Sequence, residues 1–154
     1  MNETHMVDVG DKALTKRQAT ARGSIKMLAQ TAHMVATSTL PKGNALETAR
    51  VAAILAAKNT PGLIPLCHPL PISGANCDFE CDLQNGRITA TATIKCTGQT
   101  GVEMEALTAV SAALLTIYDM TKGVDDTLAI ESIMLLEKSG GKSGDFRRDE
   151  NAEK

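Results

Sequence analysis

The chain has 154 residues, enough for one domain with a hydrophobic core of its own. Its formal net charge of −2 and its 22% of charged residues argue against a general binder of nucleic acids or membrane surfaces. Only 2% of the residues are aromatic, so the predicted core is aliphatic and few rings are available for stacking on bases.

The N-terminal region is polar and has no apolar segment typical of a signal peptide, so we expect a cytoplasmic protein. Residues 1–14 show little periodicity and are predicted to be a loosely held arm. The next predicted element is a strand over residues 18–27, and Arg17 lies directly before its first residue. The four cysteines form no CxxC pair, which predicts reduced thiols rather than disulfides or a metal site.

Two helices are predicted after this strand. Residues 28–39 suit a short helix. Residues 44–58 suit an alanine-rich helix in which Asn44 is the N-cap and Glu47 is the third helical residue. This second helix therefore begins beside Lys42.

The segment LIPLCHPLPI at residues 63–72 contains three prolines. Proline fixes the backbone angle φ and donates no hydrogen bond, which predicts a rigid connection outside any sheet. Cys67 and His68 are thereby held in a fixed geometry that suits a site. A purely structural histidine is an equally good interpretation.

Apolar residues alternate with polar ones in two neighbouring segments, residues 73–83 and 87–96, which predicts two half-buried strands. Asn85-Gly86 lies between them and predicts a two-residue type I′ turn. The acidic outer face of the first strand would then oppose the threonines and cations of the second, as cross-strand pairing favours. The two segments are therefore predicted to form a hairpin.

Residues 100–122 are predicted to form a long helix, with Thr100 and Glu103 at the spacing of a capping box. No residue from Ala106 to Tyr118 is charged, so the helix is apolar on nearly every face. This stretch is shorter than the ~20 residues that span a bilayer. We therefore expect another element or another subunit to cover its second face.

The last predicted element is a mostly buried strand over residues 129–138, followed by a flexible SGGKSG segment and a final ten residues, rich in charge, that are expected to be disordered. The order of elements predicts an α+β fold, a ferredoxin-like antiparallel sheet with helices packed on one face. We divide the chain into an N-terminal arm at 1–14, a single catalytic domain at 15–138 and a flexible segment with glycine and lysine at 139–154.

Basic side chains recur at the ends of the predicted elements: Arg17, Lys42, Lys58, Lys122, Lys138 and Lys142. Such a set suits a small polyanion such as a triphosphate or pyrophosphate, and a lysine among lysines is expected to have a lowered pKa and to exchange a proton. Scattered solubilising charge is the alternative. For Asp119 and Lys122, three residues apart on the helix surface, the alternative is an ordinary surface ion pair.

Acidic residues at the start of the long helix, Glu103 and Glu105, argue against a phosphate at that end of the helix. A carboxylate instead matches the N–H groups along the edge of a guanine or pterin ring. For Glu103 the alternative is a capping role, which Glu105 does not have.

Five segments in the right order resemble the cyclic pyranopterin monophosphate synthase family of molybdenum cofactor biosynthesis: MVDVGDK at 6–12, KGNALETARVAAILAAK at 42–58, LIPLCHPL at 63–70, TGVEMEALTAVSAALLTIYDMTK at 100–122 and LLEKSGGKSGDF at 135–146. The resemblance implies a lyase acting on a phosphorus–oxygen bond. Its substrate would be 3′,8-cyclo-7,8-dihydroguanosine 5′-triphosphate, and its products cyclic pyranopterin monophosphate and pyrophosphate.

The resemblance also implies the site residues. Asp119 and Lys122 would be the central catalytic pair, with Lys42 also near the chemistry. The expected substrate-binding residues are Arg17, Leu66, Cys67, His68, Glu103, Met104, Glu105 and Lys138. No metal ligands are implied, although Mg²⁺ can accompany the triphosphate. The family forms homohexamers of three dimers with sites at subunit interfaces, so the expected partners are the nucleotide and further copies of the chain.

Our mechanistic hypothesis gives Lys122 the role of general acid and base, while Asp119 orients it and holds its charge. Lys42 would stabilise the negative charge that develops as pyrophosphate leaves. A nucleotide-sensing module without chemistry is the alternative, and pyrophosphate release would distinguish the two. An RNA-binding domain fits less well, because the hairpin offers only Phe79, on its apolar side.

Overall fold

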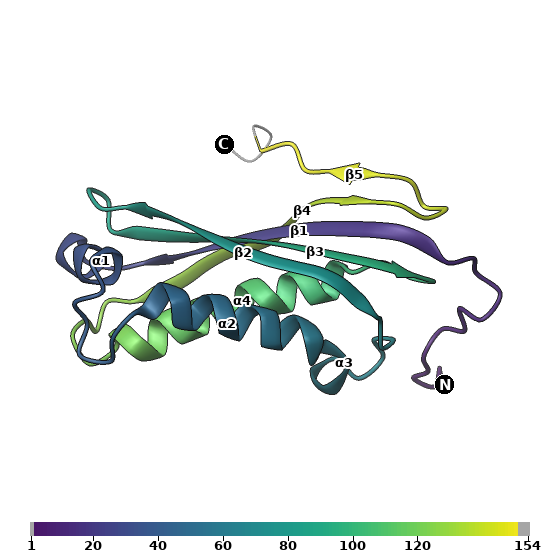
Figure 1. Cartoon of the computed structure of the whole chain (residues 1–154), viewed down its shortest axis with the longest axis horizontal. Helices are drawn as coiled ribbons and strands as arrows, with labels where there is room; N and C mark the ends of the chain where they lie inside the picture. The colour runs from purple at the N-terminus through teal and green to yellow at the C-terminus, as the bar shows by residue number, and fades with distance from the viewer. Residues whose placement is uncertain (1, 151–154) are drawn as a thin grey trace.

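Five strands form one antiparallel sheet, and helices lie against it, in the computed structural model, which describes residues 2–150 (Figure 1). The elements in chain order are β1 (Thr15–Lys26), α1 (Ala29–Ala36), α2 (Ala45–Lys58), α3 (Thr60–Leu63), β2 (Ile72–Asp82), β3 (Arg87–Gly98), α4 (Glu103–Thr121), β4 (Ala129–Ser139) and β5 (Phe146–Arg147).

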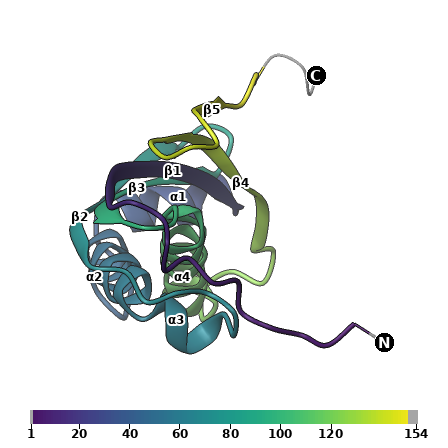
Figure 2. The ribbon, with the colours of Figure 1, turned by 90° about the vertical axis from the view of Figure 1, so that its right-hand side faces the viewer.

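The strands lie in the order β2-β3-β1-β4-β5, with β1 in the centre. The predicted α+β class is confirmed, and the order of the first four strands fits the ferredoxin-like arrangement. Helices α2 and α4 cover one face of the sheet, as predicted, while α1 lies at one end (Figures 1 and 2). We call the opposite face, on the far side from α2 and α4, the outer face.

Small residues allow α2 and α4 to pack closely on each other. Ala45, Ala49, Ala53 and Ala57 recur every four residues along α2, and each is at most 1% exposed. They form one buried stripe, because residues four apart lie on the same face of a helix. On β1, Gly23 allows α4 to lie close to the sheet, because a Cβ atom there would lie only 2.9 Å from the Leu114 side chain of α4. The position of α4 over the sheet depends on these small side chains.

The hairpin of β2 and β3 is confirmed, but the predicted two-residue type I′ turn is wrong. Asp82 pairs with Arg87, so the loop comprises residues 83–86. In that loop Gly86 has a positive φ of 65°, whereas Asn85 does not. The Asp82 carboxylate holds the turn by accepting hydrogen bonds from the Asn85 backbone and side-chain amides, at 3.1 and 2.8 Å. The register differs by two residues from the predicted one, so every side chain keeps its predicted face.

The start of α4 also differs from the prediction. The helix begins at Glu103, its N-cap is Val102, and no side chain caps it. The expected capping box of Thr100 and Glu103 is therefore wrong. The Glu103 carboxylate instead lies 3.3 Å from Nζ of Lys138 on β4, and this tertiary ion pair replaces the local contact.

The other predicted helices and strands are present, with differences in their bounds and burial. Asn44 caps α2 as predicted, accepting a hydrogen bond from the Glu47 backbone at 3.0 Å. β4 is half-buried rather than mostly buried, because it is next to the edge and only the short β5 lies beyond it. β5 also shows that part of the C-terminal stretch expected to be disordered pairs with β4; residues 151–154 lie outside the described part of the chain.

A buried carboxylate, Asp125, ties the turn after α4 to the start of α1. It is 4% exposed and accepts hydrogen bonds from the Leu28 backbone at 2.9 Å and from the Thr31 hydroxyl at 2.7 Å. Its other oxygen accepts from the backbone and hydroxyl of Thr127. Burial raises the pKa of Asp125, but these hydrogen bonds outweigh it and hold the pKa at about 2.

We predict that Asp125→Asn lowers the free energy of unfolding at pH 7 by about 2 kcal/mol, since the pKa falls from 3.8 to about 2 on folding. A lowered pKa stabilises the fold above pH 3.8, and this contribution disappears as the pH falls toward 2. Denaturant unfolding at several pH values measures it. Asp126→Asn, at the exposed neighbouring position, is the control. Equal effects of the two variants would contradict the assignment.

Candidate functional site

Three of the predicted site residues meet where α4 ends and α2 begins. Nζ of Lys42 lies 2.9 Å from one carboxylate oxygen of Asp119, and Nζ of Lys122 lies 2.8 Å from the other. Lys42 also donates to the Asp119 backbone carbonyl at 3.1 Å. We call these three residues the lysine–aspartate cluster. All three side chains are 51–58% exposed, so a ligand can reach them.

The two lysines determine the charge state of this cluster. Hydrogen bonds from Lys122 and then Lys42 hold the pKa of Asp119 at about 2. The hydrogen bond to Asp119 in turn raises the pKa of Lys122. The expectation that neighbouring lysines lower the pKa of Lys122 is therefore wrong in this chain, because the carboxylate three residues away is closer. Lys122 is therefore a protonated ammonium group at neutral pH, and its raised pKa makes it a weaker acid than an ordinary lysine.

The other predicted site residues gather at the opposite end of α4, and we call them the helix-start cluster. They come from the start of β1, the loop between α3 and β2, the first turn of α4 and the end of β4: Arg17, Leu66, Cys67, His68, Glu103, Met104, Glu105 and Lys138. Arg17 donates from Nε to the Gly98 carbonyl at 3.1 Å and from Nη2 to the Gln99 carbonyl at 3.3 Å. These bonds fasten β1 to the connection that leads into α4.

Glu105 is the most enclosed residue of this cluster, at 1% exposure. Cys67 covers it and donates from Sγ to Oε1 of Glu105 at 3.7 Å, while Oε2 is buried with no hydrogen-bond partner among residues 2–150. Burial raises the pKa of Glu105, and burial together with the Glu105 charge raises the pKa of Cys67 to about 11. The pair is therefore a thiol donor next to a buried carboxyl group whose raised pKa favours the neutral form, whereas the sequence predicted an ionised Glu105 carboxylate that binds a ring edge.

The N-terminal arm contacts the helix-start cluster, a feature that periodicity did not indicate. Nε2 of His68 lies 2.7 Å from the Val7 carbonyl oxygen. The side-chain amide of Gln99 donates to the Lys12 carbonyl at 3.2 Å. Figure 2 shows the arm running from β1 past the helical layer. The sequence does contain a sign of this contact. The MVDVGDK segment at residues 6–12 resembles the family although it forms no strand or helix, which indicates a role other than support of the fold.

The two clusters are far apart within one chain. Sixteen residues of α4 separate Glu103 from Asp119, which is about 24 Å at about 1.5 Å per residue. The structure therefore brings Lys42, Asp119 and Lys122 together, and it brings the substrate-binding set together, but it does not bring the two sets into one pocket of a single chain.

The described residues contain neither a metal-binding cluster nor a membrane-spanning helix. Within residues 2–150 no three His, Cys, Asp or Glu side chains gather closely enough to hold a metal ion, and the four cysteines are free thiols as predicted. In the same range no helix has the length and apolar character needed to cross a bilayer.

Known proteins of one family resemble this chain over most of its length. The model of the MoaC family matches residues 6–141. A curated cyclic pyranopterin monophosphate synthase of Chloroflexus aggregans (strain MD-66 / DSM 9485) is 54% identical over 147 residues, covering 96% of this chain and 89% of that protein. Proteins with the same name from Thermoanaerobacter sp. (strain X514) and Parvibaculum lavamentivorans are 51% and 54% identical; they cover 97% and 92% of this chain and 99% and 89% of their own lengths.

The buried Glu105 carboxyl generates a stability prediction. A raised pKa means that the folded chain loses stability as the pH rises through that pKa. Glutamine does not ionise, so Glu105→Gln removes this loss of stability. The variant should therefore become more stable than the parent chain as the pH rises above 4.5, the ordinary pKa of a glutamate. Thermal unfolding between pH 4.5 and 8 measures the difference.

Glu103→Gln is the matched control, since its side chain is 28% exposed and paired with Lys138. This change should give no gain that grows with pH. A Glu105→Gln protein that becomes less stable than the parent as the pH rises would show that the ionised form of Glu105 has partners.

Proposed function

Because the chain belongs to the MoaC family, we propose that it is a cyclic pyranopterin monophosphate synthase of molybdenum cofactor biosynthesis. It converts 3′,8-cyclo-7,8-dihydroguanosine 5′-triphosphate to cyclic pyranopterin monophosphate and pyrophosphate. The observation that carries the proposal is identity of 51–54% with proteins of that name over nearly the whole chain. The reaction class would be a lyase acting on a phosphorus–oxygen bond.

The lysine–aspartate cluster supplies the proposed chemistry. Lys122 acts as the general acid, because it carries a proton at neutral pH and its side chain is exposed to a ligand. Asp119 fixes the direction of that ammonium group and balances its charge. Lys42 lies on the other side of the same carboxylate and stabilises negative charge as pyrophosphate departs.

The helix-start cluster supplies the proposed binding of base and phosphate. Cys67 and His68 meet the ring system, with Met104 at 37% exposure beside them. Glu105 lies behind Cys67 and supports it. Arg17 and Lys138 provide positive charge for the phosphates at the same end of the sheet.

The separation of the clusters supports an active site shared between two copies of the chain. About 24 Å along α4 exceeds what one compact, cyclised nucleotide can bridge. A second copy that places its lysine–aspartate cluster against the helix-start cluster of the first would complete the site. We propose a homohexamer of three such dimers.

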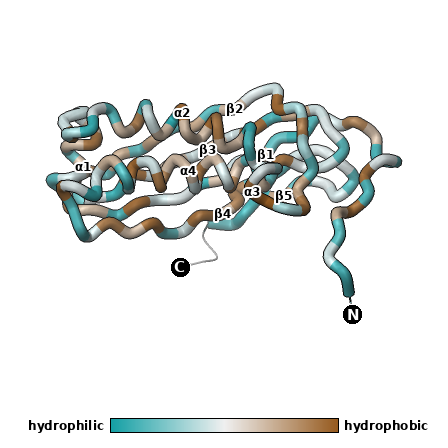
Figure 3. Tube along the Cα trace, turned by 90° about the horizontal axis from the view of Figure 1, so that it is seen from below, coloured by the Kyte–Doolittle hydropathy of each residue, from teal (hydrophilic) through white to brown (hydrophobic). Residues whose placement is uncertain are grey.

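The helical face supports such an association. Leu115 on α4 is 61% exposed, and Val51 and Leu55 on α2 are 56% and 51% exposed. Figure 3, which views the molecule from the helical side, shows hydrophobic residues along both helices. Exposed apolar side chains on two adjacent helices are typical of a surface that another subunit covers.

Mg²⁺ belongs to the proposal only as a companion of the substrate. The described residues offer no cluster of carboxylates or histidines that would hold the ion by themselves. Any Mg²⁺ would therefore be held through the triphosphate oxygens, and no step depends on it. A cytoplasmic location, where the nucleotide is available, completes the proposal.

Lys122→Ala should reduce the turnover rate at least about a thousandfold, because the proton donor is lost. Pyrophosphate release from the cyclised nucleotide measures the rate, and circular dichroism and light scattering check folding and assembly. Lys26→Ala, which removes an exposed lysine from the end of β1 and from neither cluster, is the control and should retain activity. A Lys122→Ala enzyme with near-normal turnover would refute the role, and a parent chain that binds the nucleotide without releasing pyrophosphate would favour the sensing module.

Sharing of the site between copies predicts complementation. His68→Ala and Lys122→Ala proteins should each be inactive alone. After mixing and subunit exchange, about a quarter of the parent activity should return, because half of the random dimers are mixed and each has one intact site. The doubly substituted chain mixed with either single variant is the control. No recovery despite proven exchange would place the whole site within one chain.

A further inference from the structure

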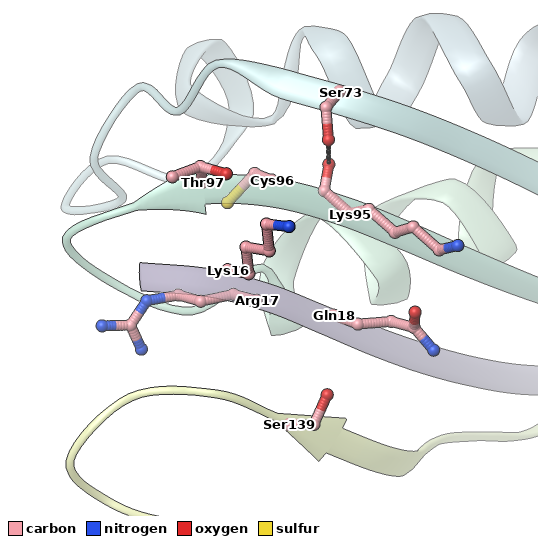
Figure 4. A pocket seen from close by; sticks show the side chains of 8 residues that line it. All are labelled: Lys16, Arg17, Gln18, Ser73, Lys95, Cys96, Thr97 and Ser139. Atoms are coloured by element: carbon pink, nitrogen blue, oxygen red, sulfur yellow. Dashed lines mark hydrogen bonds between the residues drawn. The ribbon is translucent and has the colours of Figure 1, made fainter. Parts of the chain in front are cut away.

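A pocket on the outer face of the sheet shares only Arg17 with the clusters described above. It has a volume of about 290 Å³ and lies across β1, β2, β3 and β4 near the start of β1. The register pairs Gln18 with Lys95 on one side and with Ser139 on the other, and it pairs Lys16 with Thr97. Figure 4 shows the side chains that line the pocket: Lys16, Arg17, Gln18, Ser73, Lys95, Cys96, Thr97 and Ser139.

The lining of this pocket consists of hydrogen-bond donors and contains no carboxylate. Hydroxyl donors come from Thr97 and Ser139, an amide from Gln18, ammonium groups from Lys16 and Lys95, and a guanidinium group from Arg17. The Ser73 hydroxyl donates to the Lys95 backbone carbonyl at 3.2 Å, which fixes its position beside the lysine. A pocket whose charged groups are all cations selects an anion.

The two lysines are diagonal neighbours, because Lys16 faces Thr97 and Lys95 faces Gln18. Two ammonium groups on neighbouring strands repel each other, and an anion bound near both would relieve that repulsion. Neither lysine forms an ion pair with any residue between 2 and 150. Farther along the sheet, by contrast, Arg87 lies 2.9 Å from Glu131. The pocket end of the sheet therefore carries two neighbouring lysines without a carboxylate partner in the described part of the chain.

The pocket also has room for a ligand. Gly74 faces Lys95 across β2 and β3, and a Cβ atom at Gly74 would contact the Lys95 side chain at 3.7 Å. With no side chain at this position, the hollow continues along the outer face toward Asn76 and Thr93. Glycine within a strand often marks a place where a ligand approaches the backbone.

We propose that this outer-face pocket binds a diphosphate group, with Lys16 and Lys95 as its two cationic contacts. The diphosphate is either free pyrophosphate or the terminal part of a nucleotide triphosphate, and the identification of these two sources rests on the proposed function. Arg17 connects the pocket to the helix-start cluster, since it lines the edge of the pocket and bonds to the residues that precede α4. The pocket is thus placed to receive the phosphates that leave the reaction site.

Calorimetric titration of the assembled protein with inorganic pyrophosphate tests the proposal. The parent chain should show a class of sites that weakens with added salt. Lys16→Met and Lys95→Met should each weaken that class about tenfold, because one charge-assisted hydrogen bond is lost. Lys95→Arg keeps the charge and should retain binding. Lys26→Met, an exposed lysine at the far end of the same strand, is the control and should have no effect.

Enzyme kinetics then separate the two sources of the diphosphate. If the ligand is free pyrophosphate, the variants should raise its inhibition constant and leave KM for the nucleotide unchanged. If the ligand is the end of the triphosphate, KM should rise by the same factor as the inhibition constant. The pocket assignment is overturned if pyrophosphate does not bind, or if Lys16→Met and Lys95→Met bind it as the Lys26→Met control does. The proposed reaction fails separately, if the parent chain releases no pyrophosphate.

Discussion

The Asp119 carboxylate, held between two ammonium groups, is the interaction on which the functional account depends. Its oxygens lie 2.9 Å from Lys42 and 2.8 Å from Lys122, so one negative charge fixes the positions of two positive ones. The contact exists because the alanine stripe of α2 packs closely on α4, which brings the beginning of one helix beside the end of the other. The small core residues and the charged surface site are therefore parts of one arrangement, and the fold places two ammonium groups on either side of one carboxylate.

The length of α4 sets the second constraint. A straight helix of 19 residues places its two ends too far apart for one small ligand to contact both within a chain. Each end has a different chemical character: one is exposed and charged, while the other contains the enclosed Glu105 under Cys67. A reaction that needs both a recognised base and a stabilised leaving group then favours assembly of two copies, and the exposed apolar residues of α2 and α4 offer a surface for it.

Patterns local in the sequence predicted much of the fold, and contacts distant in the sequence account for most differences. The faces of β2 and β3 were predictable because strands alternate with a period of two, and this holds even though the turn type was wrong. The capping box failed because Glu103 finds Lys138, which is 35 residues later, and sequence alone gives no sign of that partner. The burial of Glu105 likewise depends on Cys67 from a distant loop. The pKa of Lys122 was predicted in the wrong direction because of a local contact. Asp119, three residues away, raises this pKa, whereas the other lysines were expected to lower it.

A crystal structure of the Lys122→Ala protein with the cyclised nucleotide bound tests the central claim most directly. The account predicts that one copy of the chain contacts the ring system through Cys67 and His68, and that Lys42 and Asp119 of a second copy approach the sugar and the innermost phosphate. A nucleotide whose base, sugar and phosphates are all contacted by one chain, with no second copy nearby, would contradict it.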